Sequence, residues 1–206
     1  MIVLALDTCL TVCSAAVVAD GVVRAARSES MARGHQERIA PLVREVMAEA
    51  GLAFADLDRI GVTVGPGSFT GLRVGLAFAK GLGAALDRPV IGVSVLEALA
   101  HGVDGVRAAI VDARRDQVWM QVFGQDTDGE PAALSPDAAF DLLRALHRPT
   151  LVGPGAELFP DELSSARRLV REAPDPVVVA TLAGVADPAP PRPLYLRAPD
   201  ARLPAA

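Results

Sequence analysis

The glycines and hydroxyl side chains best placed for chemistry lie together in one segment, Gly65-Pro66-Gly67-Ser68-Phe69-Thr70-Gly71-Leu72-Arg73-Val74-Gly75. It follows an apolar run and precedes a helical pattern, so we expect a strand–loop–helix junction whose backbone N–H groups can bind an anion. The segment matches neither common phosphate-binding pattern. It lacks the lysine of a Walker loop, and Thr70 stands where the pattern Gly-x-Gly-x-x-Gly needs its third glycine. Weak nucleotide or anion contacts are still expected here, from Gly65, Gly67 and Ser68.

Two aspartates are further candidates for binding a nucleotide, in a cleft between two lobes. Asp7 and Asp112 each end an apolar run typical of a strand, and strand ends face the ligand in open α/β folds. Together with Thr8, they are candidates to hold a metal-bound nucleotide between two lobes, as in a weak ATP-binding or ATP-hydrolysing enzyme. Phosphotransfer sites of this kind use glycine-rich turns, however, and neither Thr8-Cys9-Leu10-Thr11 nor Ala113-Arg114-Arg115-Asp116 contains glycine.

Metal-binding and nucleophilic patterns are weaker still. A metal-binding helix would carry histidines four residues apart, but the position four after His35 is Ile39. Cys9 and Cys13 have no further Cys or His nearby, which favours two core residues in a reducing compartment. Ser68 lacks the flanking glycines of a nucleophile elbow. We predict no metal and no catalytic residue, and a peptidase is the least supported alternative.

Composition narrows the function further. The chain is 51% hydrophobic but only 4% aromatic, so small apolar residues must fill a sizeable core. Its net charge of −5 and the lack of a Lys/Arg run argue against direct binding of nucleic-acid backbone. No apolar run reaches the roughly 18 residues of a membrane span, and no signal segment is recognisable, so we expect a cytoplasmic protein that does not bind a membrane.

The elements that position these residues follow from hydrophobic periodicity. In the first half we predict three strands, a helix, a strand, a second helix, a strand and a short helix. Their expected bounds are 2–7, 12–19, 22–28, 35–50, 58–64, 70–86, 90–93 and 95–100.

The pattern then restarts. Strands are expected at 108–111, 118–123 and 150–152, a helix at 135–146, a helical or irregular segment at 160–172, and an apolar stretch at 177–186. Asp7 and Asp112 occupy equivalent strand ends, which indicates a duplication and two similar lobes, 1–101 and a smaller 102–206 with a proline-rich tail. The alternative is that two hairpins beginning with apolar strands resemble each other by chance.

A stripe of small residues marks the second long helix. Gly71, Gly75, Ala79 and Gly83 recur every four residues, and glycine inside a helix costs about 1 kcal/mol relative to alanine. The stripe must therefore permit a close backbone approach, either to the protein's own sheet or to a partner helix. If a partner covers it, Gly75→Leu would block pairing without unfolding the chain.

Several segments resemble the bacterial TsaB (YeaZ) family of tRNA threonylcarbamoyladenosine biosynthesis proteins. The resemblance covers residues 1 to about 123 and is carried by Leu4-Ala5-Leu6-Asp7-Thr8, Gly65–Gly75, Ala79-Lys80-Gly81-Leu82, Gly92–Ala100 and Asp112-Ala113-Arg114-Arg115, with Tyr195-Leu196-Arg197 near the end. It implies an α/β, two-lobed actin/Hsp70-like ATPase fold, a duplicated RNase H-like unit with a reduced C-terminal lobe.

The resemblance also implies a function. TsaB-like proteins act as non-catalytic partners of the catalytic subunit TsaD, together with the ATPase TsaE, in modifying adenosine 37 of tRNA. The expected partners are thus TsaD and TsaE, a second copy when the chain is alone, and tRNA through the complex. No cofactor is expected, unless ATP or ADP binds at the TsaD interface. In the family the two long helices pair with TsaD, which places the expected interface at His35, Ile39, Leu42, Val43, Val46, Gly71, Leu72, Gly75, Leu76, Ala79 and Gly83.

Overall fold

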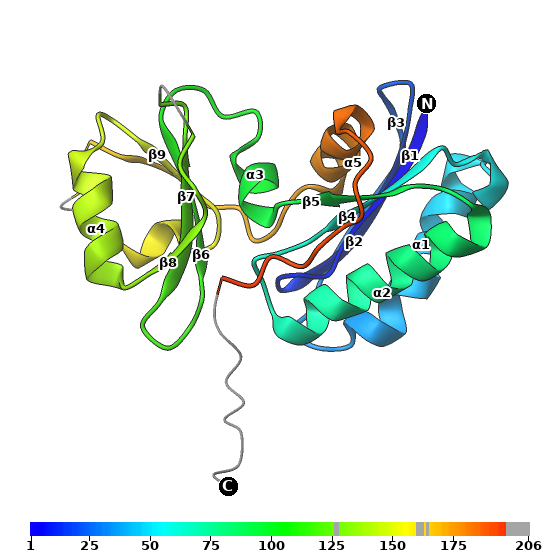
Figure 1. Ribbon diagram of the computed structural model, residues 1–206, viewed down its shortest axis with the longest axis horizontal. Coiled ribbons are helices and arrows are strands. Elements are labelled where there is room, and N and C mark those ends of the chain that lie inside the picture. The colour runs from blue at the N-terminus through cyan, green and yellow to red at the C-terminus, as the bar shows by residue number, and fades with distance from the viewer. Residues whose placement is uncertain (126–127, 160–162, 164, 197–206) are drawn as a thin grey trace, which may run out of the picture.

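The protein consists of two lobes, each built on a five-stranded sheet (Figure 1). The computed structural model describes residues 1–125, 128–159, 163 and 165–196. The end of the predicted tail, including Arg197 of the family motif, and parts of the predicted 160–172 segment therefore lie outside the described residues. Within the described residues, no helix combines the length and apolarity needed to span a membrane.

The first sheet has the order β3-β2-β1-β4-β5. β1 is antiparallel to β2, and β2 to β3, whereas β1, β4 and β5 run parallel. The strand bounds are β1 Ile2–Asp7, β2 Val12–Ala19, β3 Val22–Ser30, β4 Arg59–Thr63 and β5 Val90–Val93. β1 is central and apolar on both faces, because both faces of the sheet are covered.

The second sheet repeats this arrangement, with the order β8-β7-β6-β9-β10. β6–β7 and β7–β8 are antiparallel, and β6–β9 and β9–β10 are parallel, so β6 takes the place of β1. The bounds are β6 Arg107–Asp112, β7 Val118–Phe123, β8 Ala132–Leu134, β9 Thr150–Val152 and β10 Arg167–Leu169. The matching strand order and directions confirm the predicted duplication.

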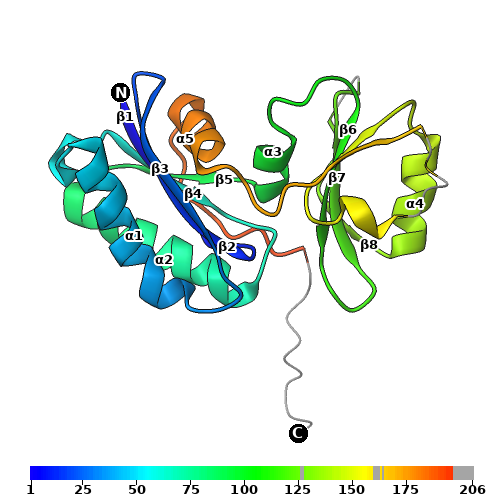
Figure 2. The same ribbon diagram turned by 180° about the vertical axis from the view of Figure 1, so that it is seen from behind.

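The two lobes differ in their helices. α1 (His35–Ala50) and α2 (Phe69–Leu86) lie side by side on one face of the first sheet, and α5 (Pro176–Val185) covers the other face (Figures 1 and 2). Alternate side chains of β1 point to opposite faces of the sheet. Leu4 and Leu6 belong to the core under α1 and α2, and Val3 and Ala5 pack with α5. In the second lobe α4 (Pro136–Ala145) follows the three antiparallel strands. Among the described residues between the parallel strands β9 and β10, the 3-10 turn η2 (Ala156–Leu158) stands where the first lobe has α2. The C-terminal lobe is therefore reduced, as predicted.

Two helices pack on the sheet of the lobe to which they do not belong in sequence. α5 comes late in the chain yet packs on β1 and β4, and a Cβ on Gly61 would lie 2.7 Å from Cβ of Ala183. The Arg59 guanidinium donates to carbonyls at the C-terminal end of α5, those of Ala183 and Gly184 in the last turn and of the capping residue Ala186, at 3.2, 3.3 and 2.7 Å. Conversely, α3 (Val95–Ala100) packs on β6 and β7 of the second lobe. The predicted boundary between residues 101 and 102 places α3 in the first lobe and α5 in the second, so it does not reflect these two contacts.

The regular elements match the predicted bounds within two residues, and the differences fall on short or uniformly apolar segments. The 160–172 segment contains the strand β10 rather than a helix, and β8 was not anticipated, because three residues are too few to show a period. α5 has no polar face to reveal it. Its start could have been recognised from Asp175, whose side chain accepts a 2.8 Å bond from Val177 N, followed by proline in the first turn.

Candidate functional site

Asp7, the predicted nucleotide ligand, is sealed inside the first lobe. It is fully buried at the end of β1. Its Oδ1 accepts hydrogen bonds from Cys9 N at 3.0 Å and from Thr63 Oγ1 at the end of β4. Burial raises the pKa of Asp7, and the bonds from Thr63 and Cys9 oppose that rise. The carboxylate therefore ties two strand ends to the loop that follows β1.

A small group of buried polar atoms surrounds this carboxylate. Within the described part of the chain, Asp7 Oδ2, Ser14 Oγ and His35 Nε2 are buried without a hydrogen-bond partner. Ser14 lies opposite Asp7 in the β1–β2 pair, and the charge of His35 lowers the pKa of Asp7. His35, predicted to face a partner, thus has its Nε2 directed into the molecule.

The start of α2 is occupied by the protein's own backbone. Cys9 O accepts a 2.8 Å bond from Ser68 N, and Thr8 Oγ1 donates to Gly71 O at 2.7 Å. A Cβ on Gly67 would clash with Cys9 O, and one on Gly71 would clash with Thr8 O. Two carbonyl oxygens thus lie where the expected anion would sit. Gly67, Gly71 and Gly75 are required because Thr8 and Cys9 of the β1–β2 loop pack directly on them, whereas Gly65 has a positive φ of 98°.

The remaining predicted ligand, Asp112, lies apart from this cluster in the second lobe. It ends β6 and is partly exposed. Its Oδ1 accepts a 2.7 Å bond from Arg114 N, and its Oδ2 forms a 3.5 Å ion pair with the Arg114 guanidinium. The structure therefore joins Asp7, Thr8, Gly67 and Ser68, with Gly65 beside them, whereas the contacts of Asp112 are with its own loop.

A hollow of ≈ 440 Å³ between the lobes does not resemble a phosphate site. The described residues that line it include a single charged side chain, the carboxylate of Glu172. Ser30 Oγ donates to Glu172 across the hollow at 3.4 Å, linking β3 to the second lobe. Its full lining is Thr11, Ser30, Met31, Ala32, Pro154 and Glu172.

The stripe of small residues on α2 faces the protein's own sheet, one of the two possibilities that the sequence left open. A Cβ on Gly75 would lie 2.5 Å from Thr8 Oγ1, and one on Gly83 would lie 2.9 Å from Arg88 O. The other predicted interface residues of the two helices are equally internal. Buried in the core are Ile39, Leu42, Val43, Val46, Gly71, Leu72, Gly75, Leu76, Ala79 and Gly83.

What α1 and α2 do present outward is a groove that the sequence did not reveal. It has a volume of ≈ 480 Å³ and is mostly apolar. Arg73 is the one charged residue among those that line it, which are Gln36, Ile39, Ala40, Phe69, Thr70, Arg73, Val74, Ala77 and Phe78. The available signal was the second face of α2, where Arg73 and Ala77 are exposed one turn apart and are followed by the half-buried apolar residues Val74 and Phe78.

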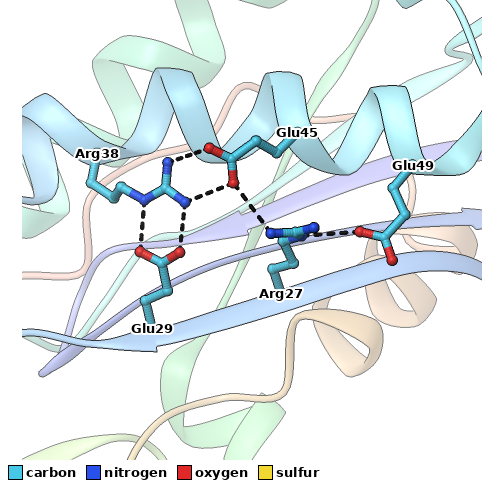
Figure 3. A network of polar contacts seen from close by, with 5 residues as sticks. All are labelled: Arg27, Glu29, Arg38, Glu45 and Glu49. Carbon is cyan, nitrogen blue, oxygen red and sulfur yellow. Dashed lines mark hydrogen bonds and ion pairs between the residues drawn. The ribbon is translucent and has the colours of Figure 1, made fainter.

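A network of charges fixes α1 on the edge strand β3 (Figure 3). Arg38 donates two 2.6 Å bonds to Glu29 on β3 and two 2.7 Å bonds to Glu45, two turns further along the same face of α1. Arg27 on β3 extends it to Glu45 at 3.4 Å and Glu49 at 3.0 Å. Arg38 holds the pKa of both Glu29 and Glu45 below its usual value through these hydrogen bonds. The network sets the position of one wall of the groove.

Comparisons with known proteins agree with this architecture. A sequence profile of the family "TsaD: tRNA N6-adenosine threonylcarbamoyltransferase" matches residues 25–142. The chain is 34% identical over 173 residues to the tRNA threonylcarbamoyladenosine biosynthesis protein TsaB of Escherichia coli, covering 78% of this chain and 74% of that protein.

Two solved structures place the fold. YeaZ from Pseudomonas aeruginosa superposes with a TM-score of 0.75 at 29% identity, covering 95% of this chain and 99% of the other. The ROK hexokinase of Thermus thermophilus superposes with a TM-score of 0.53 at 14% identity, covering 90% and 99%, a likeness of fold alone. With the duplicated sheets, these likenesses confirm the two-lobed actin/Hsp70-like fold. The chain belongs to the TsaB (YeaZ) family of tRNA threonylcarbamoyladenosine biosynthesis proteins.

Proposed function

We propose that this protein is a cytoplasmic, non-catalytic subunit of the complex that forms N6-threonylcarbamoyladenosine at position 37 of tRNA. It pairs with TsaD, acts with the ATPase TsaE, and meets tRNA through the complex. The family assignment supports involvement in this biosynthesis.

The observation that carries the non-catalytic role is the sealed end of β1. In this fold a ligand would approach at the strand ends, but Asp7 is fully buried and the carbonyls of Thr8 and Cys9 lie on the start of α2. The chain thus uses the positions of the expected site to hold its helices in place.

The groove between α1 and α2 supports the role of a partner subunit. A mostly apolar groove of ≈ 480 Å³ on two long helices that lie side by side suits a helical pair from a related fold. The same face would pair two copies of the chain when TsaD is absent.

Reconstitution tests the proposal. The purified chain, TsaD and TsaE of the same organism are incubated with tRNA, ATP and threonylcarbamoyl-adenylate, and the modified nucleoside is quantified by mass spectrometry. We expect modification with all components and none when this chain is omitted or is the only one of the three present. Modification by this chain without TsaD, or full modification without this chain, would refute the proposal.

A further inference from the structure

An exposed cluster of two aromatic rings and one arginine stands at the mouth of the groove. The Arg73 guanidinium carbon lies 3.6 Å from the centroid of the Phe69 ring, and Arg73 Nε donates to the Tyr195 hydroxyl at 3.3 Å. The centroids of the Phe69 and Tyr195 rings are 5.8 Å apart. Phe69 is 53% and Tyr195 47% exposed, so the three side chains order one another without being buried.

The C-terminal segment brings Tyr195 to this place from outside the helix pair. Leu194 N donates to Val64 O at 2.7 Å, at the end of β4. Pro191 lies against Gly92 in β5, where a Cβ would be 3.2 Å from Pro191 Cβ. The described part of the segment thus runs along the first lobe (Figure 1), and Tyr195 lies beside the first turn of α2. A surface defined by α1 and α2 alone is therefore incomplete.

The α2 side of this surface is positively charged although the protein is acidic. α2 contains Arg73 and Lys80, seven residues apart and both exposed, and contains no carboxylate. On α1, Glu45 and Glu49 are engaged by Arg38 and Arg27 toward β3, and the exposed Glu37 and Arg44 carry opposite charges. The net charge of the whole chain is −5, so the cations of α2 are a local feature.

We propose that Phe69, Arg73 and Tyr195 form the central contact of the partner surface, and that the partner presents a carboxylate flanked by apolar side chains. This inference rests on the proposed function. Tyrosine and arginine dominate the binding energy of protein interfaces, and aromatic stacking fixes the guanidinium plane before binding. In the described part of the chain the bond to Tyr195 uses Nε, which leaves both Nη atoms for a bidentate carboxylate.

The charge also distinguishes the partner from a second copy. An isologous homodimer buries the same surface twice, so it brings two sets of Arg73 and Lys80 together. A partner with an acidic counterpart gains attraction instead, and its association is faster at low salt. We therefore expect this surface to bind TsaD, through a carboxylate that faces Arg73, more tightly than it binds a second copy of the chain.

Calorimetric titration of the full chain with full-length TsaD of the same organism tests this. We expect Tyr195→Ala to weaken binding about 30-fold and Arg73→Glu at least as much, in line with hot-spot residues. Tyr195→Phe, which keeps the ring, should cost only a few-fold. Leu142→Ala, an equally exposed apolar residue on α4 of the other lobe, is the matched control and should bind as the original chain does. Thermal melts verify that each variant is folded.

Three outcomes would overturn the inference, and they are distinguishable. If the unmodified chain does not bind TsaD, the proposed function fails and this inference with it. If the chain binds but Tyr195→Ala and Arg73→Glu bind equally well, only the inference fails. If Arg73→Glu weakens the homodimer, measured by light scattering, as much as the TsaD complex, the surface is built for a second copy and the acidic partner is refuted.

Discussion

Thr8 and Gly71 are joined by a 2.7 Å hydrogen bond from the Thr8 hydroxyl to the Gly71 carbonyl, although 63 residues separate them. This bond attaches the loop after β1 to the first turn of α2. It explains why glycine recurs along α2: the helix lies so close to Thr8 that a side chain at Gly71 or Gly75 would meet it. The Gly65–Gly75 segment is thus an internal docking motif for the helix that carries the outer groove.

The first prediction concerns the two kinds of glycine in α2. Gly75→Leu should lower the free energy of unfolding by more than about 3 kcal/mol, because overpacking a filled core is costly and even a Cβ would lie 2.5 Å from Thr8 Oγ1. The earlier expectation that Gly75→Leu blocks pairing in a folded chain does not fit this packing. Gly81 is the control, because a Cβ there would have nothing within 4 Å. Gly81→Ala should therefore raise the free energy of unfolding by up to about 1 kcal/mol. Urea denaturation measures both, and equal effects would contradict the packing argument.

This pair of glycines also shows what sequence can and cannot predict. The period of α2 identified the small-residue face and its bounds within one residue, because helical spacing is local information. It did not identify what covers that face, since β1 and its loop come together with α2 only in the fold. The contact of Arg73 with Tyr195 spans 122 residues and has no local signal at all.

A second prediction follows from the buried charge of Asp7. Its pKa in the folded protein is raised above the ordinary value of 3.8, so the folded state binds a proton more readily than the unfolded chain. Asp7 therefore costs stability as pH rises through and above 3.8. Asp7→Asn keeps an acceptor for Thr63 and Cys9, and we expect it to be more stable than the original chain at neutral pH.

The pH dependence of stability distinguishes the loss of the Asp7 charge from a change in packing. The advantage of Asp7→Asn should shrink as pH falls below 3.8, where the aspartate is protonated in both states. Denaturation curves across pH measure it, with Asp112→Asn, at the equivalent but partly exposed strand end, as the control. A stability difference that does not change with pH would show that the ionisation of Asp7 has no influence.

A third prediction concerns the network that holds α1. Arg38 lowers the pKa of Glu29 and Glu45 from the usual 4.5, so their contribution to stability is present above that pH and is lost as pH falls through the lowered values. Arg38→Ala should therefore lower the melting temperature at neutral pH and lower it much less in acid. Arg33→Ala, an exposed arginine just before the same helix, is the control. Equal losses at neutral and acid pH would contradict the role of the two carboxylates.

The last prediction tests the outer groove as the partner surface without disturbing the fold. Ala77 is exposed on α2 and lines the groove, whereas Ala84 is exposed on the same helix outside it. Ala77→Arg places a long charged side chain in the apolar groove, and we expect it to weaken TsaD binding by about 100-fold or more, since steric and desolvation penalties at an interface reach several kcal/mol. Ala84→Arg introduces the same charge two turns further along the helix, beyond the groove lining, and should bind within a few-fold of the original chain. Both substitutions favour helix formation about as well as alanine, so melting temperatures should stay close to the original. Co-purification and calorimetry with TsaD give the comparison, and equal binding by the two variants would move the partner surface away from the groove.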